Sequence, residues 1–297
     1  MPFDPTRAPV VFGEALFDCF PDGAEVLGGA PFNVAWHLAA FGAGPVFVSR
    51  VGEDALGARI EAAMQQQGMT RLGLQRDPQH PTGQVQVTLA GGEPSYNIVA
   101  GSAYDFIDAE ALPTRAAGGL LYHGTLALRN ADSAAALKRL RADTDAVFLD
   151  VNLRPPWWSE AQAKAVLDGA RWVKLNEDEL ARLAPAGDSP ESRAAALMQR
   201  HGLERVYGTL GAAGAFALDA DGTLDRVSPG SGVEVVDAVG AGDGFAAVLI
   251  LGLLRGWSVG DTLERAQGFA SAIVGRRGAT IDDPAFYAEL SALWGAD

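Results

Sequence analysis

The segment 120–209 alternates strand-like and helix-like stretches, and this alternation restricts the fold more than any other feature of the chain. Short apolar runs predict strands at 120–123, 146–151, 172–175 and 205–209, and helical periodicity predicts helices between them at 131–141, 160–170 and 191–201. Parallel strands need such crossover connections, whereas antiparallel strands do not. We therefore expect an α/β fold, with a mostly parallel central sheet covered by helices on both faces.

The remaining segments extend this pattern and add a smaller β unit. Strands are expected at 8–14 and 45–51, and helices at 31–41, 54–67, 242–254, 259–275 and 284–294. An antiparallel pair is expected at 214–219 and 223–228. Polar and apolar residues alternate in 83–90, and 96–100 returns as a second strand after a turn at 91–94, so this hairpin has one exposed face. We expect one domain, 1–297, with a small β lid contributed by about 15–30 and 83–101.

The composition argues against several classes of protein. The 297 residues are 48% apolar and 20% charged, which excludes wholesale disorder, and the formal net charge of −14 argues against nucleic acid or an anionic membrane as a partner. The one cysteine, Cys19, forms no internal disulfide and suits a reducing compartment. The apolar run 244–254 is too short to span a bilayer, and no signal peptide is visible. We expect a cytoplasmic protein.

A glycine-rich turn at 237–244 leads straight into this apolar run. The first amides of a helix have no intrahelical partner and carry a partial positive charge, so the backbone of Gly240, Ala241 and Gly242 can cradle a phosphate. Asp243 stands among these amides, where it would take a proton from a hydroxyl that attacks the phosphate, or would merely cap a buried helix. The glycine spacing matches neither a Walker A loop nor the Rossmann fingerprint.

A second glycine pair, Gly28 and Gly29, precedes the helix expected at 31–41. Glycine permits close approach of the backbone to a ligand, and Asn33 can donate hydrogen bonds to a hydroxyl and accept them from it. Taken alone, this segment is better explained as a structural turn. In combination with the turn at 237–244 it becomes informative.

Together the two glycine segments resemble the two signatures of the ribokinase-like (PfkB) family of carbohydrate kinases, and the resemblance covers nearly the whole chain. It implies a ribokinase-like fold and transfer of the γ-phosphate of ATP to a primary hydroxyl of a sugar. Under this resemblance Asp243 is the catalytic base, and the anion hole is formed by Gly240, Ala241 and Gly242. The sugar would be held by the first strand and the first signature, through Asp18, Gly28, Gly29 and Asn33.

The resemblance also assigns residues to the nucleotide and to metal ions. Asn176 and Glu179 match an Asn-x-x-Glu motif that organises Mg²⁺ through water near the phosphates. Asp237 opens the second signature and implies a K⁺ site beside the anion hole. Ser271 stands at the adenine wall, where the family often has Asn or His. The other nucleotide-side residues are Thr209, Gly211 and Gly214.

The choice of sugar rests on a third segment. Asp150, Asn152 and Arg154 resemble the Asp-x-Asn-x-Arg segment of bacterial fructokinases, with Arg154 beside the transferring phosphate, where a guanidinium offsets negative charge. Fructose is the first choice. Ribose, 2-keto-3-deoxygluconate, aminoimidazole riboside and a nucleoside stay open, because specificity depends on a few contacts. A catalytically inactive regulator that binds sugar or nucleotide also stays open, although Asp243 and its glycines argue against it.

The hairpin at 83–100 is expected to act as the lid that excludes water from ATP. Val85, Val87 and Leu89 form its apolar face, and an isolated two-stranded hairpin is marginal in water, so this face needs cover. The sequence therefore predicts a homodimer built through the lids. Among the histidines, His123 is placed nearest the site, because it ends a predicted strand.

Overall fold

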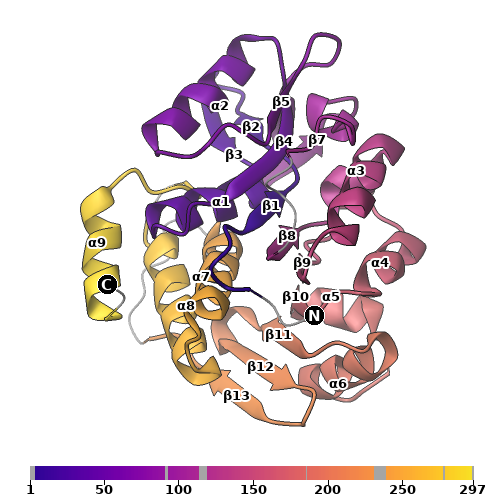
Figure 1. Ribbon diagram of the computed structural model, residues 1–297, viewed down its shortest axis with the longest axis vertical. Coiled ribbons are helices and arrows are strands. Elements are labelled where there is room, and N and C mark those ends of the chain that lie inside the picture. The colour runs from indigo at the N-terminus through magenta and orange to yellow at the C-terminus, as the bar shows by residue number, and fades with distance from the viewer. Residues whose placement is uncertain are drawn as a thin grey trace.

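The computed structural model describes residues 4–90, 93–113, 119–184, 186–230, 239–276 and 278–295. Within these residues the chain forms a nine-stranded sheet, a four-stranded sheet, and helices on both faces of the larger sheet (Figure 1). From one edge to the other, the large sheet contains β13 (Leu224–Val227), β12 (Ala215–Asp219), β11 (Arg205–Thr209), β10 (Trp172–Asn176), β9 (Ala146–Asp150), β8 (Leu120–His123), β1 (Val10–Phe12), β4 (Val46–Gly52) and β5 (Leu74–Asp77). Neighbouring strands pair in parallel except β11 with β12 and β12 with β13, so the predicted sheet is confirmed.

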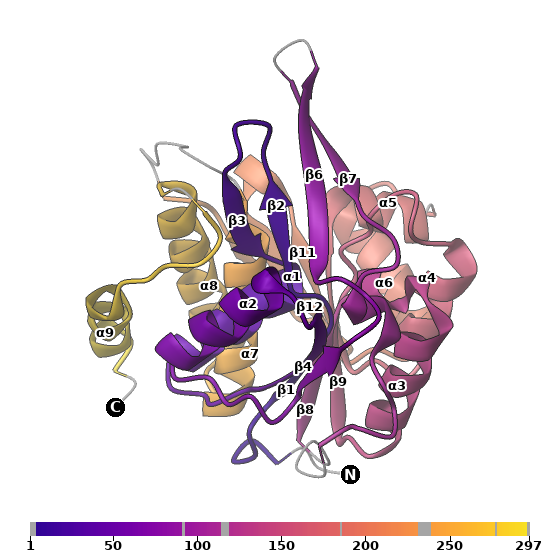
Figure 2. The ribbon, with the colours of Figure 1, turned by 90° about the horizontal axis from the view of Figure 1, so that it is seen from above.

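Helices cover both faces of this sheet (Figure 2). One face carries α1 (Ala30–Ala40), α2 (Ala55–Gln66), α7 (Ala241–Arg255), α8 (Val259–Val274) and α9 (Pro284–Leu293). The other face carries α3 (Ala131–Ala142), α4 (Glu160–Leu167), α5 (Glu177–Leu183) and α6 (Pro190–His201). Strands β8 and β9 lie in the middle of the sheet and are buried along their whole length, which explains their nearly continuous apolar sequence.

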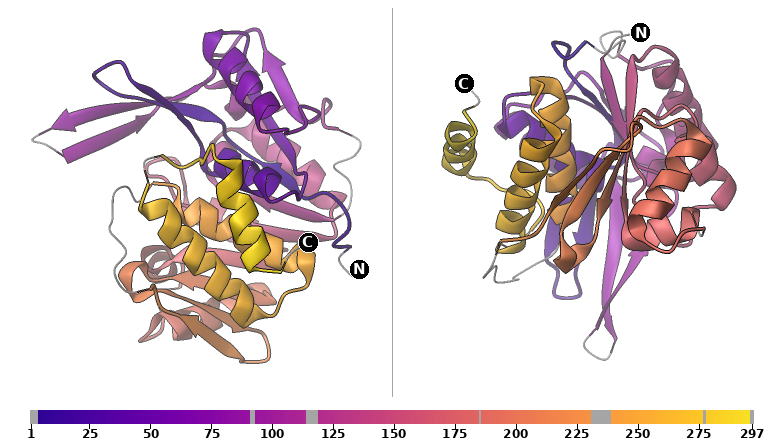
Figure 3. Two further views of the ribbon diagram at one scale, coloured as in Figure 1. Left: turned by 90° about the vertical axis from the view of Figure 1, so that its left-hand side faces the viewer. Right: turned by 90° about the horizontal axis from the view of Figure 1, so that it is seen from below.

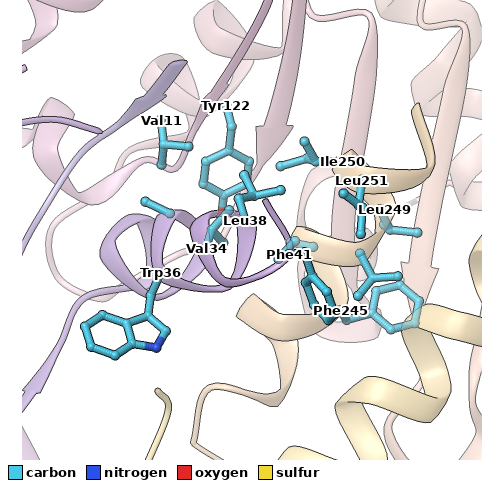
Figure 4. Close-up of a cluster of buried hydrophobic side chains, with 14 of the residues drawn as sticks. Val11, Val34, Trp36, Leu38, Phe41, Tyr122, Phe245, Leu249, Ile250 and Leu251 are labelled. Carbon is cyan, nitrogen blue, oxygen red and sulfur yellow. The ribbon is translucent and has the colours of Figure 1, made fainter. Parts of the chain in front are cut away.

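Helix α7 is deeply buried in the middle of its length. Every residue from 244 to 252 is buried. Val34 and Leu38 of α1 belong to the same apolar cluster as Tyr122 of β8 and Ile250 of α7 (Figure 4). Close packing of this kind fixes the positions of α1 and α7 relative to each other and to the sheet.

The first strand is shorter than predicted. The segment expected as one strand, 8–14, gives only β1, because the chain turns at Gly13, whose φ is +147°. A Cβ at Gly13 would lie 2.5 Å from Cγ of Pro31, so the turn packs directly against the start of α1 and requires glycine. The chain leaves the large sheet at this point.

The chain then enters the small sheet, whose two hairpins project from the large sheet (Figures 2 and 3). Its strand order is β3 (Glu25–Gly28), β2 (Leu16–Cys19), β6 (Gly83–Ala90) and β7 (Glu93–Ile98), and β2 and β6 are parallel. Val85 and Val87 are buried within the single chain, with 5% and 3% of their surface exposed. Contrary to the sequence-based expectation, these two side chains therefore need no second subunit to cover them.

Several elements escaped the sequence analysis. Strand β5 lies at the edge of the sheet and has the polar sequence Leu-Gln-Arg-Asp, so no apolar alternation marked it. Helix α5 has only 7 residues. In the predicted turn at 91–94, Gly91 and Gly92 lie outside the described residues, whereas Glu93 and Pro94 belong to β7. Among the described helices, none is long and apolar enough to cross a membrane.

Candidate active site

The order of strands reverses beside β1. Strand β4 lies on one side of β1, whereas β8, which comes much later in the chain, lies on its other side. In open parallel sheets, ligands bind outside the carboxyl ends of the strands at such a reversal. The expected crevice is therefore bordered by the residues after β1, Gly13 and Glu14, and by those after β8, Gly124 and Thr125. The small sheet rises from the same end, because β2 follows β1.

The N-terminus of α7 lies against the carboxyl ends of the central strands. A Cβ at Gly242 would be 3.7 Å from Nζ of Lys174 in β10. The N-cap Gly240 has a φ of +81°, and a Cβ there would lie 2.4 Å from Cβ of Ala279, so only glycine fits. The amides of Ala241, Gly242 and Asp243 have no acceptor within the helix. This end of α7 can therefore bind an anion.

Asp243, in the first turn of α7, is hydrogen-bonded to Asn33, a residue of the N-terminal glycine segment. Nδ2 of Asn33 in α1 donates to Oδ2 of Asp243 at 2.7 Å. Burial raises the pKa of Asp243 to about 6, although the hydrogen bond from Asn33 lowers this pKa. The negative charge of Asp150 raises this pKa further, and the positive charge of Lys174 lowers it. A carboxyl whose pKa is near neutrality is suited to general-base catalysis.

A polar ladder of Tyr122, Asp150 and Lys174 lies on three neighbouring strands, β8, β9 and β10. Nζ of Lys174 donates to both carboxylate oxygens of Asp150, at 3.0 and 2.8 Å, and the Tyr122 hydroxyl donates to Oδ2 at 3.3 Å. Burial lowers the pKa of Lys174, but the carboxylates of Asp150, Glu179 and Asp243 together more than offset this, so the pKa is raised and the ammonium stays charged. The ladder therefore places a buried ion pair behind the amide of Gly242, with the ammonium of Lys174 as the nearer partner.

The sequence analysis predicted neither a role for Lys174 in the site nor its ion pair with Asp150. Lys174 is only 7% exposed, and a lysine in the middle of a short apolar strand was the signal available in the sequence. A lysine is almost never fully buried without a partner. The partner could not be identified from the sequence, because it comes from the neighbouring strand.

On the sugar side, Asp18 of β2 faces Gly28 of β3. A Cβ at Gly28 would lie 3.7 Å from Oδ2 of Asp18, so glycine leaves space beside this carboxylate. Gly29 has a φ of +107°, and a Cβ there would lie 2.7 Å from the carbonyl oxygen of Glu14, so glycine is required. Burial raises the pKa of Asp18, and the charge of Arg154 lowers it.

Arg154 follows β9 on an exposed loop, after Asn152, whose φ is +41°. Burial raises the pKa of both Asp18 and Asp243 and is the largest effect on each. The positive charge of Arg154 lowers both pKa values. It also acts on Glu14, a buried carboxyl whose pKa is raised by burial to about 7. The structure therefore brings Arg154 within electrostatic reach of the predicted base and of the predicted sugar-binding carboxylate.

Asn176 and Glu179 form a capping box at the start of α5. Oδ1 of Asn176 accepts from the amide of Glu179 at 2.9 Å, and Oε2 of Glu179 accepts from the amide of Asn176 at 2.9 Å. Oε1 of Glu179 accepts from the amide of Leu153 at 2.7 Å. Both carboxylate oxygens are thus engaged with the backbone, which suits contact with Mg²⁺ through water better than direct ligation. In the part of the chain that the structure describes, no three His, Cys, Asp or Glu side chains gather as a metal site.

The predicted nucleotide residues lie at the ends of β10 and β11, in the turn after β11, and on α8. Thr209 and Asn176 are register partners at the carboxyl ends of β11 and β10. Gly211 and Gly214 bound the turn that follows β11, and a Cβ at Gly214 would lie 2.0 Å from a carbonyl oxygen of β13, so packing within the sheet already requires this glycine. Ser271 lies on α8, which packs against β12 and β13.

The structure does not describe one predicted position and turns another away from the site. Asp237 lies outside the described residues. His123 is fully buried, and its Nδ1 lies 2.8 Å from the carbonyl oxygen of Gly124. Successive strand residues point to opposite faces, so His123 points away from the face that Tyr122 shares with α7. Burial lowers the pKa of His123 to about 3, which leaves the ring neutral.

Comparison with known proteins shows a match along nearly the whole chain. A model of the pfkB family of carbohydrate kinases matches residues 20–285. Fructokinase from Salmonella typhimurium is 33% identical over 259 residues, which cover 82% of this chain and 83% of that protein. A fructokinase double mutant from Vibrio cholerae O395, solved with fructose, ADP and potassium ion bound, has a TM-score of 0.82 and 27% identity, over 98% of this chain and 100% of that chain. Fructokinase from Xylella fastidiosa with bound ATP has a TM-score of 0.84 at 23% identity, over 97% and 99% of the two chains, and shows the fold alone.

Proposed function

The chain belongs to the pfkB family of carbohydrate kinases and is an ATP-dependent phosphotransferase, and we propose that it phosphorylates a primary hydroxyl of fructose. The observation that carries the proposal is the carboxyl of Asp243, which Asn33 holds at the glycine-lined start of α7. The segment of Asp150, Asn152 and Arg154 and the similarity to fructokinases favour fructose over other sugars.

In this proposal the sugar lies between the small sheet and α7. Asp18 accepts hydrogen bonds from hydroxyls of the sugar, and the backbone at Gly28 and Gly29 allows close approach. The reacting hydroxyl contacts Asp243, which takes its proton as the oxygen attacks the phosphate. Asn33 donates to Oδ2 of Asp243, so the hydrogen bond fixes the carboxylate and leaves Oδ1 for the hydroxyl.

The phosphates of ATP lie at the amides of α7. Ala241 and Gly242 donate to the transferring group, with the ammonium of Lys174 behind them and the guanidinium of Arg154 on the exposed side, so that charge developing on the phosphate is offset. Mg²⁺, when bound, would neutralise further phosphate charge, and the residues fitted to hold it through water are Asn176 and Glu179. The nucleotide would extend over Thr209, Gly211, Gly214 and Ser271.

Three further parts of the proposal concern the surroundings of the site. Residues 1–297 act as one unit in which the small sheet closes as a lid and excludes water from ATP. A K⁺ ion beside the anion hole, with Asp237 among its ligands, would order the amides that meet the phosphate, and the fructokinase from Vibrio cholerae O395 is described with potassium ion bound. A homodimer through the lids is supported only by exposed apolar side chains on the small sheet, such as Val26 and Tyr96.

Steady-state kinetics with a panel of substrates tests the proposed function. Release of ADP is measured with fructose, ribose, 2-keto-3-deoxygluconate, aminoimidazole riboside and adenosine at fixed ATP and Mg²⁺. We expect the highest kcat/KM for fructose. A higher kcat/KM for any other compound would reject fructose as the substrate, and binding of fructose without turnover would favour a regulatory protein.

The pKa of Asp243 predicts the acid side of the pH profile. A general base works only when ionised, and the pKa of Asp243 is about 6, so kcat/KM for fructose should fall as the pH decreases through 6. Well below pH 6 the decrease should approach about tenfold per pH unit, because one proton inactivates the enzyme. The measurement is kcat/KM between pH 5 and 8 at constant ionic strength.

Two variants identify the group that titrates. Asp150→Asn removes a negative charge that raises the pKa of Asp243 and frees the positive charge of Lys174, so the acid limb should move to lower pH. Glu14→Gln removes another buried carboxyl of the site, whose pKa is about 7, and should leave the limb near pH 6. A limb that disappears in Glu14→Gln would assign the titration to Glu14 instead.

A further inference from the structure

A buried hydrogen-bonded cluster of Trp36, His37 and Tyr287 joins α1 and α9 to the segment 279–281. His37 is completely buried. Its Nε2 lies 3.0 Å from the carbonyl oxygen of Ala279, and its Nδ1 lies 2.9 Å from the hydroxyl of Tyr287. Nε1 of Trp36 donates to the carbonyl oxygen of Ile281 at 3.1 Å. The segment 279–281 is thus held by two ring donors from consecutive residues of α1.

The protonation of His37 follows from its partners. Burial lowers its pKa to about 4, so the ring is neutral and carries one hydrogen. The carbonyl of Ala279 can only accept, so this hydrogen must be on Nε2. The hydroxyl of Tyr287 lies 2.9 Å from Nδ1 and 3.3 Å from the carbonyl oxygen of Ile281, and its one hydrogen can be donated to either acceptor. The ring also packs edge-to-face on Phe269, with centroids 5.0 Å apart, which fixes its orientation.

Ala279 is the residue that packs against the start of the anion hole. The position of a Cβ at Gly240 would lie 2.4 Å from Cβ and 2.5 Å from Cα of Ala279. No side chain separates the two backbones. Any shift of Ala279 therefore opens or closes the space beside the first amides of α7, where the phosphate is expected.

One face of helix α1 contacts both Asp243 and Ala279. Asn33 and His37 are four residues apart, so they lie one above the other on the helix. Asn33 holds Asp243, and His37 holds Ala279 against Gly240. The same helix begins at Gly29, beside the expected sugar.

From this arrangement we infer that His37 is a positioning residue for phosphoryl transfer, which sets the anion hole at the start of α7 through the carbonyl of Ala279. The inference rests on the proposed function, because it takes the amides of α7 as the phosphate site. His37 does not touch the sugar. Its loss should therefore lower kcat and leave the KM for the sugar nearly unchanged.

Two substitutions at the same position test this role. His37→Leu removes the donor to Ala279, and because a misplacement of about 1 Å can cost roughly 100-fold in rate, we expect kcat to fall roughly 10- to 100-fold. The KM for the sugar should stay within about threefold, since the sugar contacts are untouched. His37→Gln places an amide donor at a similar reach, and it should recover most of kcat.

Phe41→Leu provides the control for stability. Phe41, the C-cap of α1, lies one turn beyond His37 and packs on Phe269, Tyr287 and Trp294, but its side chain offers no hydrogen bond to the segment 279–281. This variant should lower the melting temperature and keep the wild-type kcat. The inference is overturned if His37→Leu keeps kcat within threefold of the wild type, or if Phe41→Leu loses as much kcat as His37→Leu at an equal loss of melting temperature.

If His37→Leu does not fold, Tyr287→Phe provides the second test, because it keeps the volume of the core and removes the hydroxyl that contacts both Nδ1 of His37 and the carbonyl oxygen of Ile281. A severalfold lower kcat at unchanged sugar KM supports the role of His37, and an unchanged kcat overturns it. All variants are assayed with the sugar for which the wild type has the highest kcat/KM. Failure to use fructose would appear in the wild-type protein and would contradict the proposed substrate, whereas failure of the inference would appear only as active His37 and Tyr287 variants.

Discussion

Asp243→Asn is expected to abolish most of the kinase activity. The substitution keeps the size of the side chain and an oxygen that can accept from Asn33, but it removes the group that takes the proton of the sugar hydroxyl. Loss of a general base typically costs about 10²–10⁴ in rate, so kcat should fall by that factor. The measurement is kcat with saturating fructose and ATP, from release of ADP.

Asp261→Asn is a matched control for this variant. Asp261 occupies the same position in the first turn of α8 as Asp243 does in α7, but it is exposed. Both substitutions remove a negative charge from the first turn of a helix, so the loss of its favourable interaction with the helix dipole is common to both. The control should keep the wild-type kcat, and an Asp243→Asn enzyme with more than half of the wild-type kcat would remove Asp243 from the mechanism.

Asp18→Ala is expected to weaken binding of the sugar without affecting binding of ATP. A hydrogen bond to a charged group contributes about 1.5–3 kcal/mol, so the KM for fructose should rise roughly 10- to 150-fold. The KM for ATP should stay nearly constant, because Asp18 lies on β2 of the small sheet, whereas the phosphates are expected at α7. Both constants are obtained by varying one substrate at saturation of the other.

Asp22→Ala serves as the control in the same hairpin. Asp22 is exposed in the turn between β2 and β3, where its carboxylate accepts from the amide of Ala24 at 3.0 Å. This variant should change neither KM. A higher KM for ATP in Asp18→Ala, with an unchanged KM for fructose, would contradict the placement of Asp18 at the sugar.

The central strands and most helices could be predicted from the sequence, because each has a strong local pattern. Strands buried on both faces are short apolar runs, and β8 (Leu120–His123) and β11 (Arg205–Thr209) have the predicted bounds. Edge strands lack this pattern, which is why β5 was missed. The division of 8–14 at Gly13 depends on contact with Pro31, which no local pattern shows.

The parts of the site that are formed by continuous sequence motifs could be predicted from the sequence. The glycines around Asp243 and the pair at Gly28 mark backbone that must approach a ligand, and this signal is local. The partners of Lys174 and His37 come from distant segments, 24 and 242 residues away in sequence. Identifying them requires the register of the sheet and the packing of α1, so the sequence alone could not reveal these contacts.

Calorimetric titration of Asp243→Asn with fructose, in the presence of a non-hydrolysable ATP analogue, separates binding of the sugar from proton transfer. The proposed mechanism has Asp243 accept a proton during transfer, while Asp18 and its neighbours hold the sugar. It predicts that the variant binds fructose with a Kd within about tenfold of the wild type, although its kcat falls by about 100-fold or more. Loss of fructose binding in proportion to the loss of turnover would contradict this mechanism, because Asp243 would then hold the sugar rather than activate it.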